Sequence, residues 1–362
     1  MSSHDPGWYK HFLKMDVNDF DQLVERLTPY IQKNNTTFRA AISVGERLAV
    51  TLRYLATGNS FSRLSTLFLL GWYISFMERE IIIKCVSIKV PSAPEEWADI
   101  ASRFEICRNF PNCVGALGGR HIAIQTPANK DCECLINKNH NSIVLTALVD
   151  ADYKFLFVDI EARSCKSNSD YFTRSRLSKA LSDNTLNFPP AKPLPYETDP
   201  MPFVIVASNA FPQTPHLLKP FSHCSKDKTH KIFNYRLARA RNVVENVFGV
   251  CAARFKILSR PLCLTENKAK AIVLAICCIH NFLITRKSVY FRQTEFDTDS
   301  NGMSLPENWR LEVTAKVIFS STQISNYSKE QFEDSAMTIR DNFMEYFITQ
   351  HGEVHGQYNV NE

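Results

Sequence analysis

The arginine-rich segment Tyr235–Leu258 (YRLARARNVVENVFGVCAARFKIL) carries a single carboxylate, Glu245. Apolar residues recur in it at steps of three and four, which predicts an amphipathic helix with one buried face. Glu245 follows Val244 of that face, so we expect its side chain at the edge of the buried surface. Two chemistries fit this position. Glu245 could form an ion pair with Arg241 one turn back, or it could be a metal ligand in a site whose arginines face phosphates.

Other residues of metal-binding type are scattered. The stretch Cys132–Cys134 lies near His121 and His140, but no second cysteine pair follows at metal spacing, so zinc is disfavoured. We favour a strand position for His121, bonded to backbone, over a role as phosphate donor or ligand. The adjacent His280 and Asn281 end an apolar run and are predicted to be a buried polar pair bonded to backbone.

The composition is that of an ordinary globular protein. The chain has 362 residues, 44% of them hydrophobic and 22% charged, which suffices for two or three domains. The net charge of +5 permits a nucleic-acid partner without requiring one. The 11 cysteines are odd in number and several lie in apolar runs, which favours reduced thiols and an intracellular, nuclear or cytoplasmic, location. No signal peptide and no uncharged apolar run of membrane-spanning length are found, so we expect no membrane association.

The N-terminal part is predicted to be all-helical. Two short predicted helices flank Gly71, an arrangement typical of a helix-turn-helix. The second begins with Trp72 and Tyr73, and aromatic side chains there favour a protein contact over the reading of base edges. The first predicted helix has an apolar stripe that begins at Phe20 and stops before Pro29. Further helices are predicted at 44–56, 60–69 and 72–86, and a last one ends near Phe104.

Strands and helices alternate after residue 113. Two apolar runs flank Asp150-Ala151-Asp152 and predict a hairpin, and a uniformly apolar run at 203–207 predicts a covered strand. The segment 184–202 holds six prolines and predicts an exposed loop. The expected elements are strands at 114–124, 142–149, 153–160 and 203–207, helices at 169–183, 235–258, 268–284 and 337–349, and an irregular segment at 287–326.

Five blocks of this sequence resemble, in order, the catalytic domain of PIF/Harbinger-type DDE transposases. They are CVGALGGRHIAIQTP, SIVLTALVDADYKFLFVDI, KSNSD, MPFVIVASNAFPQTPHLLKPF and KIFNYRLARARNVVENVFG, and the likeness extends from about Trp8 to Gln357. The resemblance implies an α/β RNase H-like domain, a mixed sheet flanked by helices, with an all-helical N-terminal region. It divides the chain into a helical region at 1–110, the transposase-type domain at 111–286 and a C-terminal loop and closing helix at 287–362.

In that family two Asp and one Glu hold two divalent ions, Mg²⁺ or Mn²⁺. The resemblance places Gly118 (in GALGGRHI) and Ser208 (in VASNAF) at the two Asp positions and Glu245 at the Glu position. Glycine supplies no ligand, and a serine hydroxyl does not neutralise Mg²⁺. We therefore expect no tightly bound metal and no transposition activity. Asp170 matches another acidic position of the family and is the first substitute ligand to consider beside Glu245. Two other acids lie at predicted strand ends, Asp150 and Asp159.

Our leading hypothesis is a domesticated or decayed Harbinger-type transposase homologue without nuclease activity, acting as a DNA- or protein-binding module. One alternative is a divalent-metal-dependent DNA endonuclease that uses substitute ligands, and another is a protein-interaction scaffold that does not bind DNA. The resemblance also implies a Myb-like partner protein and a nuclear location. Ten basic residues form what we call the basic ridge: Lys226, Lys228, His230, Lys231, Arg236, Arg239, Arg241, Arg254, Lys256 and Arg260. The backbone of duplex DNA could bind along this ridge, but the same residues are also explained by a solvated helix face.

Overall fold

The fold is built on one mixed sheet of five strands in the order β3-β2-β1-β6-β7. The first three strands form an antiparallel meander, while β6 runs parallel to β1 and β7 parallel to β6. This order and these directions are those of an RNase H-like domain, so the predicted fold class is confirmed. The strands are β1 Cys113–Ala123, β2 Ser142–Val149, β3 Phe155–Ala162, β6 Val204–Ala207 and β7 Leu217–Leu218. A computed structural model of the chain describes residues 9–35, 37, 40–59, 88–125, 142–162, 172–222, 225, 227–286 and 333–358.

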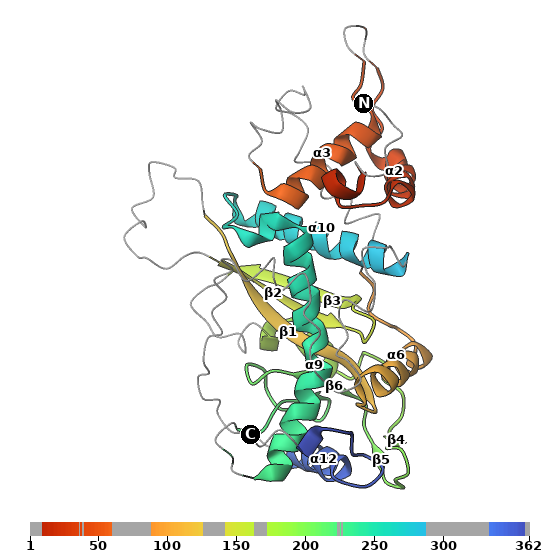
Figure 1. Cartoon of the computed structure of the whole chain (residues 1–362), viewed down its shortest axis with the longest axis vertical. Helices are drawn as coiled ribbons and strands as arrows, with labels where there is room; N and C mark the ends of the chain where they lie inside the picture. Colours follow the sequence, from red (N-terminus) through yellow and green to blue (C-terminus); the bar gives the residue numbers. More distant parts are fainter. Residues whose placement is uncertain are drawn as a thin grey trace, which may run out of the picture.

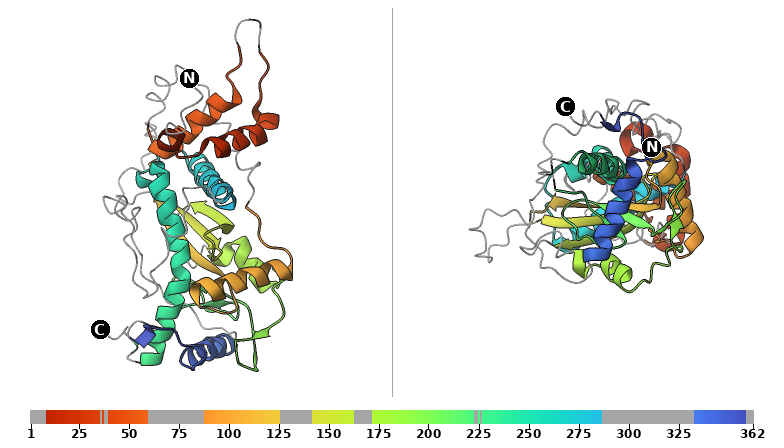
Figure 2. Two further views of the ribbon diagram at one scale, coloured as in Figure 1. Left: turned by 45° about the vertical axis from the view of Figure 1, so that its right-hand side comes forward. Right: turned by 90° about the horizontal axis from the view of Figure 1, so that it is seen from below.

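Helices cover both faces of the sheet (Figures 1 and 2). Alternate residues of each strand point to opposite faces, so the strands divide their side chains between two buried clusters. On β1, Ala116 and Ile122 belong to the cluster that contains α9 and α10, whereas Leu117 belongs to the cluster that contains α6 and α8. Val114 also belongs to the second cluster, because the register of β1 shifts between Cys113 and Gly115. The covering helices are α6 Pro94–Arg108, α8 Arg176–Ser182, α9 Lys228–Arg254 and α10 Glu266–Thr285.

The helix α9 runs along the long axis of the molecule and connects its two ends (Figure 1). It begins earlier than predicted because Asp227 caps it, accepting a hydrogen bond of 2.9 Å from the Thr229 amide. At its N-terminal end it packs against α12 (Glu333–Phe347), and beyond its C-terminal end the short helix η3 (Lys256–Ser259) contacts α3. The predicted helices at 235–258, 268–284 and 337–349 thus correspond to α9, α10 and α12.

The helical N-terminal region shares its core with the sheet domain. Buried residues of η1 (Tyr9–Leu13), α2 (Val17–Ile31) and α3 (Val44–Thr57) belong to the same cluster as those of α9 and α10. As predicted, α3 ends at Gly58, whose φ of +63° is the left-handed conformation that glycine favours. The domain boundaries proposed from the sequence stay a prediction.

Two further sequence-based assignments were wrong. The helix α2 does not stop before Pro29 but continues to Ile31, whose buried side chain anchors the last turn in the core. The proline-rich segment 184–202 is not entirely loop, because β4 (Lys192–Pro193) and β5 (Pro200–Met201) pair within it. The predicted helices at 60–69 and 72–86, the Trp72–Tyr73 turn and the irregular segment 287–326 lie outside the described residues.

The polar pair at the end of α10 joins this helix to the edge strand, as predicted. The His280 Nε2 atom lies 2.7 Å from the Tyr153 carbonyl oxygen. Asn281 accepts a hydrogen bond of 2.8 Å from the Phe155 amide and donates one of 2.7 Å to the Phe155 carbonyl oxygen. Within the described ranges, α10 is the one helix long and apolar enough to cross a membrane, but 67% of its apolar stretch is buried inside the protein, as in a core helix.

Candidate functional site

The candidate site lies where β1 and β6 run side by side beneath α9. Leu117 of β1 pairs with Ala207 of β6 in a parallel register, so the next residues, Gly118 and Ser208, are neighbours across the two strands. Val206, two residues before Ser208, belongs to the core cluster beneath α9. Gly118 faces α9, and Ser208 directly follows the last residue of β6.

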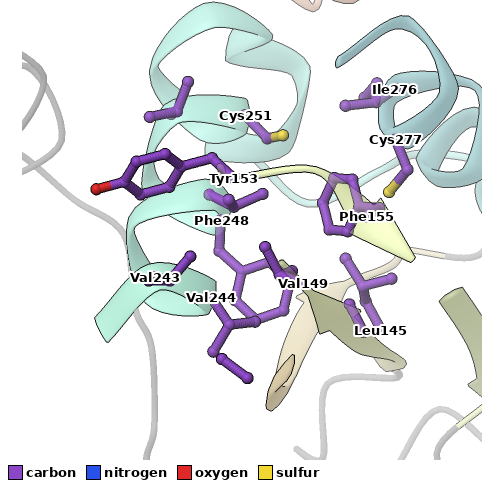
Figure 3. Packing of buried hydrophobic residues seen from close by; sticks show 14 of the residues in the cluster. Leu145, Val149, Tyr153, Phe155, Val243, Val244, Phe248, Cys251, Ile276 and Cys277 are labelled. Carbon is purple, nitrogen blue, oxygen red and sulfur yellow. The ribbon is translucent and has the colours of Figure 1, made fainter. Parts of the chain in front are cut away.

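The helix α9 packs directly on the backbone of Gly118. A Cβ atom built at Gly118 would lie 2.8 Å from Cγ1 of Val244 and 3.3 Å from Cε2 of Phe248, closer than such atoms normally approach. Figure 3 shows Val244 and Phe248 in the space between α9 and the strands. Glu245 follows Val244 and lies beside this contact, and Ser208 follows the residue that pairs with Leu117, so positions 118, 208 and 245 lie in one region of the fold.

Glu245 is engaged in an ion pair within its own helix. Its Oε1 atom lies 2.8 Å from Nη1 of Arg241, one turn earlier, and the two side chains are 44% and 24% exposed. The ion pair considered from the sequence is therefore the observed geometry. An exposed pair of this spacing stabilises a helix by only a few tenths of a kcal/mol (about 0.3–0.5). The pair therefore matters less for stability than for the charge at the candidate site.

Arg120 is a site residue that the sequence analysis missed. It lies two residues after Gly118 on β1 and therefore points to the same face, with its guanidinium carbon 5.9 Å from the centre of the Phe248 ring. Burial lowers the pKa of Arg120 to about 10, and the nearby carboxylate of Glu245 acts in the opposite direction. The alternation of residues in GALGGRHI was the signal, because it sets Arg120 on the face of Gly118.

The side chains described here do not fit a pair of divalent ions. Of the three positions that meet, Gly118 has no side chain, Ser208 has a neutral hydroxyl, and Glu245 is bound to an arginine with Arg120 close by. In the part of the chain that the structure describes, no three His, Cys, Asp or Glu side chains gather as a metal-binding group. Divalent ions such as Mg²⁺ and Mn²⁺ need several negatively charged oxygen ligands, and this donor set cannot provide them.

The other acids considered as substitute ligands are placed elsewhere. Asp159 pairs with Thr146, which pairs with Gly119, so it lies on the sheet face opposite to Gly118. Asp150 sits in the β2–β3 hairpin, where its Oδ1 atom accepts hydrogen bonds from two backbone amides of the turn. Burial raises the pKa of Asp150 to about 7. Asp170 lies outside the described residues, as do Cys132, Cys134 and His140.

The prediction that Arg236 belongs to a DNA-facing ridge is wrong. Its side chain is 2% exposed, and burial lowers its pKa to about 10. The guanidinium donates hydrogen bonds to the carbonyl oxygens of Gly352, at 2.6 Å, and Asn109, and lies over the Phe347 ring at 4.2 Å. Arg236 therefore joins the start of α9 to the C-terminal segment and the end of α6.

Arg254 is also internal, contrary to the prediction. It is 8% exposed, and its Nε atom donates a hydrogen bond of 3.1 Å to the carbonyl oxygen of Lys14 near the start of the chain. Both arginines lie off the apolar stripe in sequence, but their long aliphatic arms carry the guanidinium to carbonyl groups of neighbouring segments. The spacing of apolar residues alone cannot reveal such a partner.

The basic ridge is smaller than the sequence suggests. Arg239 lies over the Tyr235 ring at 5.9 Å and is half-buried, and His230 stacks on Phe221 at 3.9 Å. Lys226 lies outside the described residues. The members that remain exposed lie at or just beyond the two ends of α9: Lys228, Lys231, Lys256 and Arg260.

Comparison with known proteins agrees with this architecture. Residues 117–281 match the sequence model of the DDE superfamily endonuclease family. The chain is 25% identical over 304 residues to Protein ALP1-like of Arabidopsis thaliana. The matched region covers 78% of this chain and 72% of that protein. It is 26% identical over 265 residues to Antagonist of Like Heterochromatin Protein 1 of the same plant, covering 67% of this chain and 63% of that protein. No solved structure matches the chain.

Proposed function

This chain carries a DDE superfamily endonuclease domain over residues 117–281 and is related to Harbinger transposase-derived proteins; from this we propose that it binds duplex DNA without cutting it. The observation that carries the proposal is the meeting of Gly118, Ser208 and Glu245, of which Glu245 alone is an acid and is paired with Arg241. The domain keeps the architecture of a nuclease, but uncharged residues stand at two of the three positions where carboxylates would hold the metals.

Cleavage of a phosphodiester by two metals needs acids on both sides of the ion pair, because the two dications lie roughly 3.5–4 Å apart. DDE domains ancestrally use divalent metals for this step. Replacing two carboxylates by Gly118 and Ser208 removes two negative charges, and Arg120 adds a positive one nearby. The proposed loss of activity follows from this change of charge.

The exposed part of the basic ridge supports DNA binding. Lys228 and Lys231 lie at one end of α9, and Lys256 and Arg260 lie just beyond the other end. A helix of 27 residues is about 40 Å long, comparable to one turn of duplex DNA at about 34 Å. Both groups of cations could therefore contact the phosphates of one duplex, in a manner that is independent of sequence.

Fluorescence anisotropy of a labelled duplex, titrated with purified protein at low and moderate salt, tests the binding. We expect an affinity that falls steeply with salt. The double variant Lys228→Gln with Lys231→Gln should reduce the salt slope by about 2, close to 0.9 for each lost phosphate contact. Absence of binding at low salt would overturn the DNA-binding function.

Incubation of supercoiled plasmid with the protein and Mn²⁺ tests the loss of cleavage. We expect the plasmid to stay supercoiled. Nicking that disappears in the Glu245→Ala variant would instead support the alternative of an endonuclease with substitute ligands, Asp170 among them.

A second candidate function is a protein-interaction scaffold. It is favoured by the name of one relative, which describes an antagonist of Like Heterochromatin Protein 1 and so implies action on another protein. A Myb-like partner and a nuclear location belong to the same hypothesis. If the anisotropy experiment finds no DNA binding while the folded protein is intact, this function replaces the first.

A further inference from the structure

The turn between β4 and β5 and the segment that follows α12 lie at one end of the molecule (Figures 1 and 2). Each contributes an exposed ring, Tyr196 and His351, and the two rings are stacked, with centroids 4.5 Å apart and planes inclined by 25°. Tyr196 is 81% exposed, more than any other large apolar side chain in the described ranges. Because so little of the ring is buried, the hydrophobic effect does not account for its position.

The β4–β5 turn holds Tyr196 in an unusual backbone conformation. Its φ of +66° lies in the left-handed region, which a bulky residue rarely adopts. The turn is anchored to the domain, because the side-chain amide of Asn112 donates hydrogen bonds to the carbonyl oxygens of Lys192, at 2.8 Å, and Met201, at 3.2 Å. Leu194, at the start of the turn, is buried. A strained but anchored turn therefore presents the ring to solvent, which reduces the ordering cost of binding a partner there.

Carboxylates lie near this ring. Burial raises the pKa of Tyr346, a residue near the end of α12, and the buried Arg236 acts in the opposite direction. Glu105, Glu197 and Tyr196 raise this pKa further, so these three side chains lie near the Tyr346 phenol. Glu105 and Glu197 are exposed, and neither forms an ion pair with another residue that the structure describes. Since the whole chain carries a net charge of +5, this acidic surface differs from the average of the protein.

The C-terminal segment repeats the combination of ring and carboxylate. Tyr358 is 51% exposed, and its hydroxyl donates a hydrogen bond of 3.0 Å to Glu353, two residues after His351. We call the following residues the acidic aromatic surface: Glu105, Tyr196, Glu197, His351, Glu353 and Tyr358.

This combination suits cations carried by the side chains of a protein. The face of a tyrosine ring attracts a lysine or arginine group that lies within about 6 Å of its centre. Carboxylates without a basic partner accept charge-assisted hydrogen bonds from the same groups. They also repel phosphates, so a nucleic acid is the less favourable occupant. A segment with several basic residues can meet the separate carboxylates together.

We propose that the acidic aromatic surface binds a lysine- or arginine-rich segment of a partner protein. One basic side chain of that segment lies on the open face of the Tyr196 ring, whose other face is covered by His351. Glu105 and Glu197 accept hydrogen bonds from the basic side chains. The surface includes none of the lysines that we propose to contact DNA, so this inference adds a protein contact and does not depend on the DNA-binding function.

Fluorescence anisotropy of a labelled oligolysine peptide, titrated with the full chain at low salt, tests the surface. We expect oligolysine to bind and an oligoglutamate of equal length not to bind. Tyr196→Gly removes the ring, suits the left-handed backbone and should weaken oligolysine binding about two- to fivefold. Tyr196→Phe keeps the ring and should bind like the wild type. So should the matched control Tyr30→Ala, because Tyr30 is an exposed tyrosine on α2, at the opposite end of the molecule.

A second pair of variants tests the carboxylates. Glu105→Gln combined with Glu197→Gln should weaken oligolysine binding roughly fivefold, because two exposed ion pairs with the peptide are lost. Asp21→Asn combined with Glu25→Gln removes the same charge from exposed positions of α2 and should bind like the wild type. Circular dichroism shows whether each variant is folded.

Several outcomes would overturn the proposal. They are failure of the wild type to bind oligolysine, unchanged binding in Tyr196→Gly, and equal weakening by the variants on α2. Binding of single-stranded oligothymidine that Tyr196→Gly abolishes would assign the ring to nucleic-acid bases instead. A wild-type dimer in sedimentation that Tyr196→Gly dissociates would make a second copy of the chain the occupant.

The same variant separates this surface from the DNA-binding function. Tyr196→Gly should bind duplex DNA like the wild type, because its ring is not among the proposed phosphate contacts. Failure of the wild type to bind duplex DNA, with oligolysine binding that depends on Tyr196, would overturn the DNA-binding function and retain the acidic aromatic surface.

Discussion

Gly118 is where loss of a side chain and close packing coincide. A Cβ atom there would meet both γ-carbons of Val244 within 3.0 Å, at 2.8 and 2.9 Å, so any larger residue would displace Val244 or α9. The packing therefore disfavours a carboxylate at this position. Restoring an acid at Gly118 alone requires α9 or Val244 to move, and a β-branched side chain has few alternative rotamers.

We predict that Gly118→Ala destabilises the protein by about 1–3 kcal/mol, because the added methyl group overfills the contact with α9. The midpoint of urea unfolding would measure this. Gly45→Ala is the matched control, since a Cβ atom there meets nothing closer than 3.9 Å and alanine is the better helix residue. Equal stability of Gly118→Ala and the wild type would contradict the close packing of α9 on β1.

His280 should make the stability depend on pH. Burial lowers its pKa to about 4 in the folded protein, against about 6.5 in the unfolded chain. Between these values only the unfolded chain binds the proton, so the free energy of unfolding attributable to His280 decreases as pH falls through this range. Asp150, with its pKa raised to about 7, acts in the opposite direction, because its folded form binds a proton first.

The difference between the wild type and His280→Gln isolates the contribution of His280, because Asp150 is present in both proteins. We predict that the advantage of the wild type at pH 7 shrinks by roughly 2–3 kcal/mol at pH 4.5. Chemical unfolding at the two pH values measures it. An advantage that does not change with pH would show that His280 is not a buried neutral side chain.

Individual charged residues were the least predictable part of the sequence. The pairing of Glu245 with Arg241 could be anticipated because both lie on one helix, one turn apart. The burial of Arg236 and Arg254 could not, because their partners are backbone carbonyls of Gly352, Asn109 and Lys14, more than 100 residues away in sequence. A local pattern holds no information about such contacts.

The helix α9 combines three roles along its length. Its N-terminal third anchors the C-terminal segment through Arg236, its middle carries Glu245 above β1, and its last residue, Arg254, holds the N-terminal region. A basic helix can therefore use its arginines inside the fold, as Arg236 and Arg254 do. The exposed lysines near the ends of α9 are the residues that we propose to contact DNA.

Replacing Arg236 by Met should destabilise the fold by about 2–5 kcal/mol, because the buried carbonyl groups of Gly352 and Asn109 would lose their donor. It should leave the affinity of the folded protein for DNA unchanged. Arg239→Met serves as the matched control in the same helix, and we expect its effect on stability to stay within about 0.5 kcal/mol. A loss of DNA affinity in folded Arg236→Met would contradict this prediction and indicate that Arg236 contributes to DNA binding.

Elements with a clear period or cap could be predicted from the sequence. The helix α3 has both, since Ser43 accepts from the Glu46 amide at its start and Gly58 ends it. The β2–β3 hairpin and the buried strand β6 also match their predicted positions. Pro29 misled the prediction because α2 loses only the one amide donor that proline lacks, while Ile31 in the same turn gains burial.

The molecule as a whole has the sheet order and covering helices of the DDE endonuclease fold, and Glu245 is the one acid among positions 118, 208 and 245. The sheet order could be inferred because five sequence blocks follow the family order, and the meeting of positions 118, 208 and 245 follows from that order together with the register of β1 and β6. The sequence blocks could not reveal the packing between these positions. There α9 lies directly on Gly118, and Arg120 is near Glu245.

The proposal that this protein binds duplex DNA without metals is tested most directly by duplex anisotropy in EDTA and in Mg²⁺ at matched ionic strength. We predict the same dissociation constant in both conditions, because the contacts to phosphate come from lysine and arginine side chains. Binding that requires Mg²⁺, and is lost in the Glu245→Ala variant, would contradict this prediction and show that the site still holds metal ions.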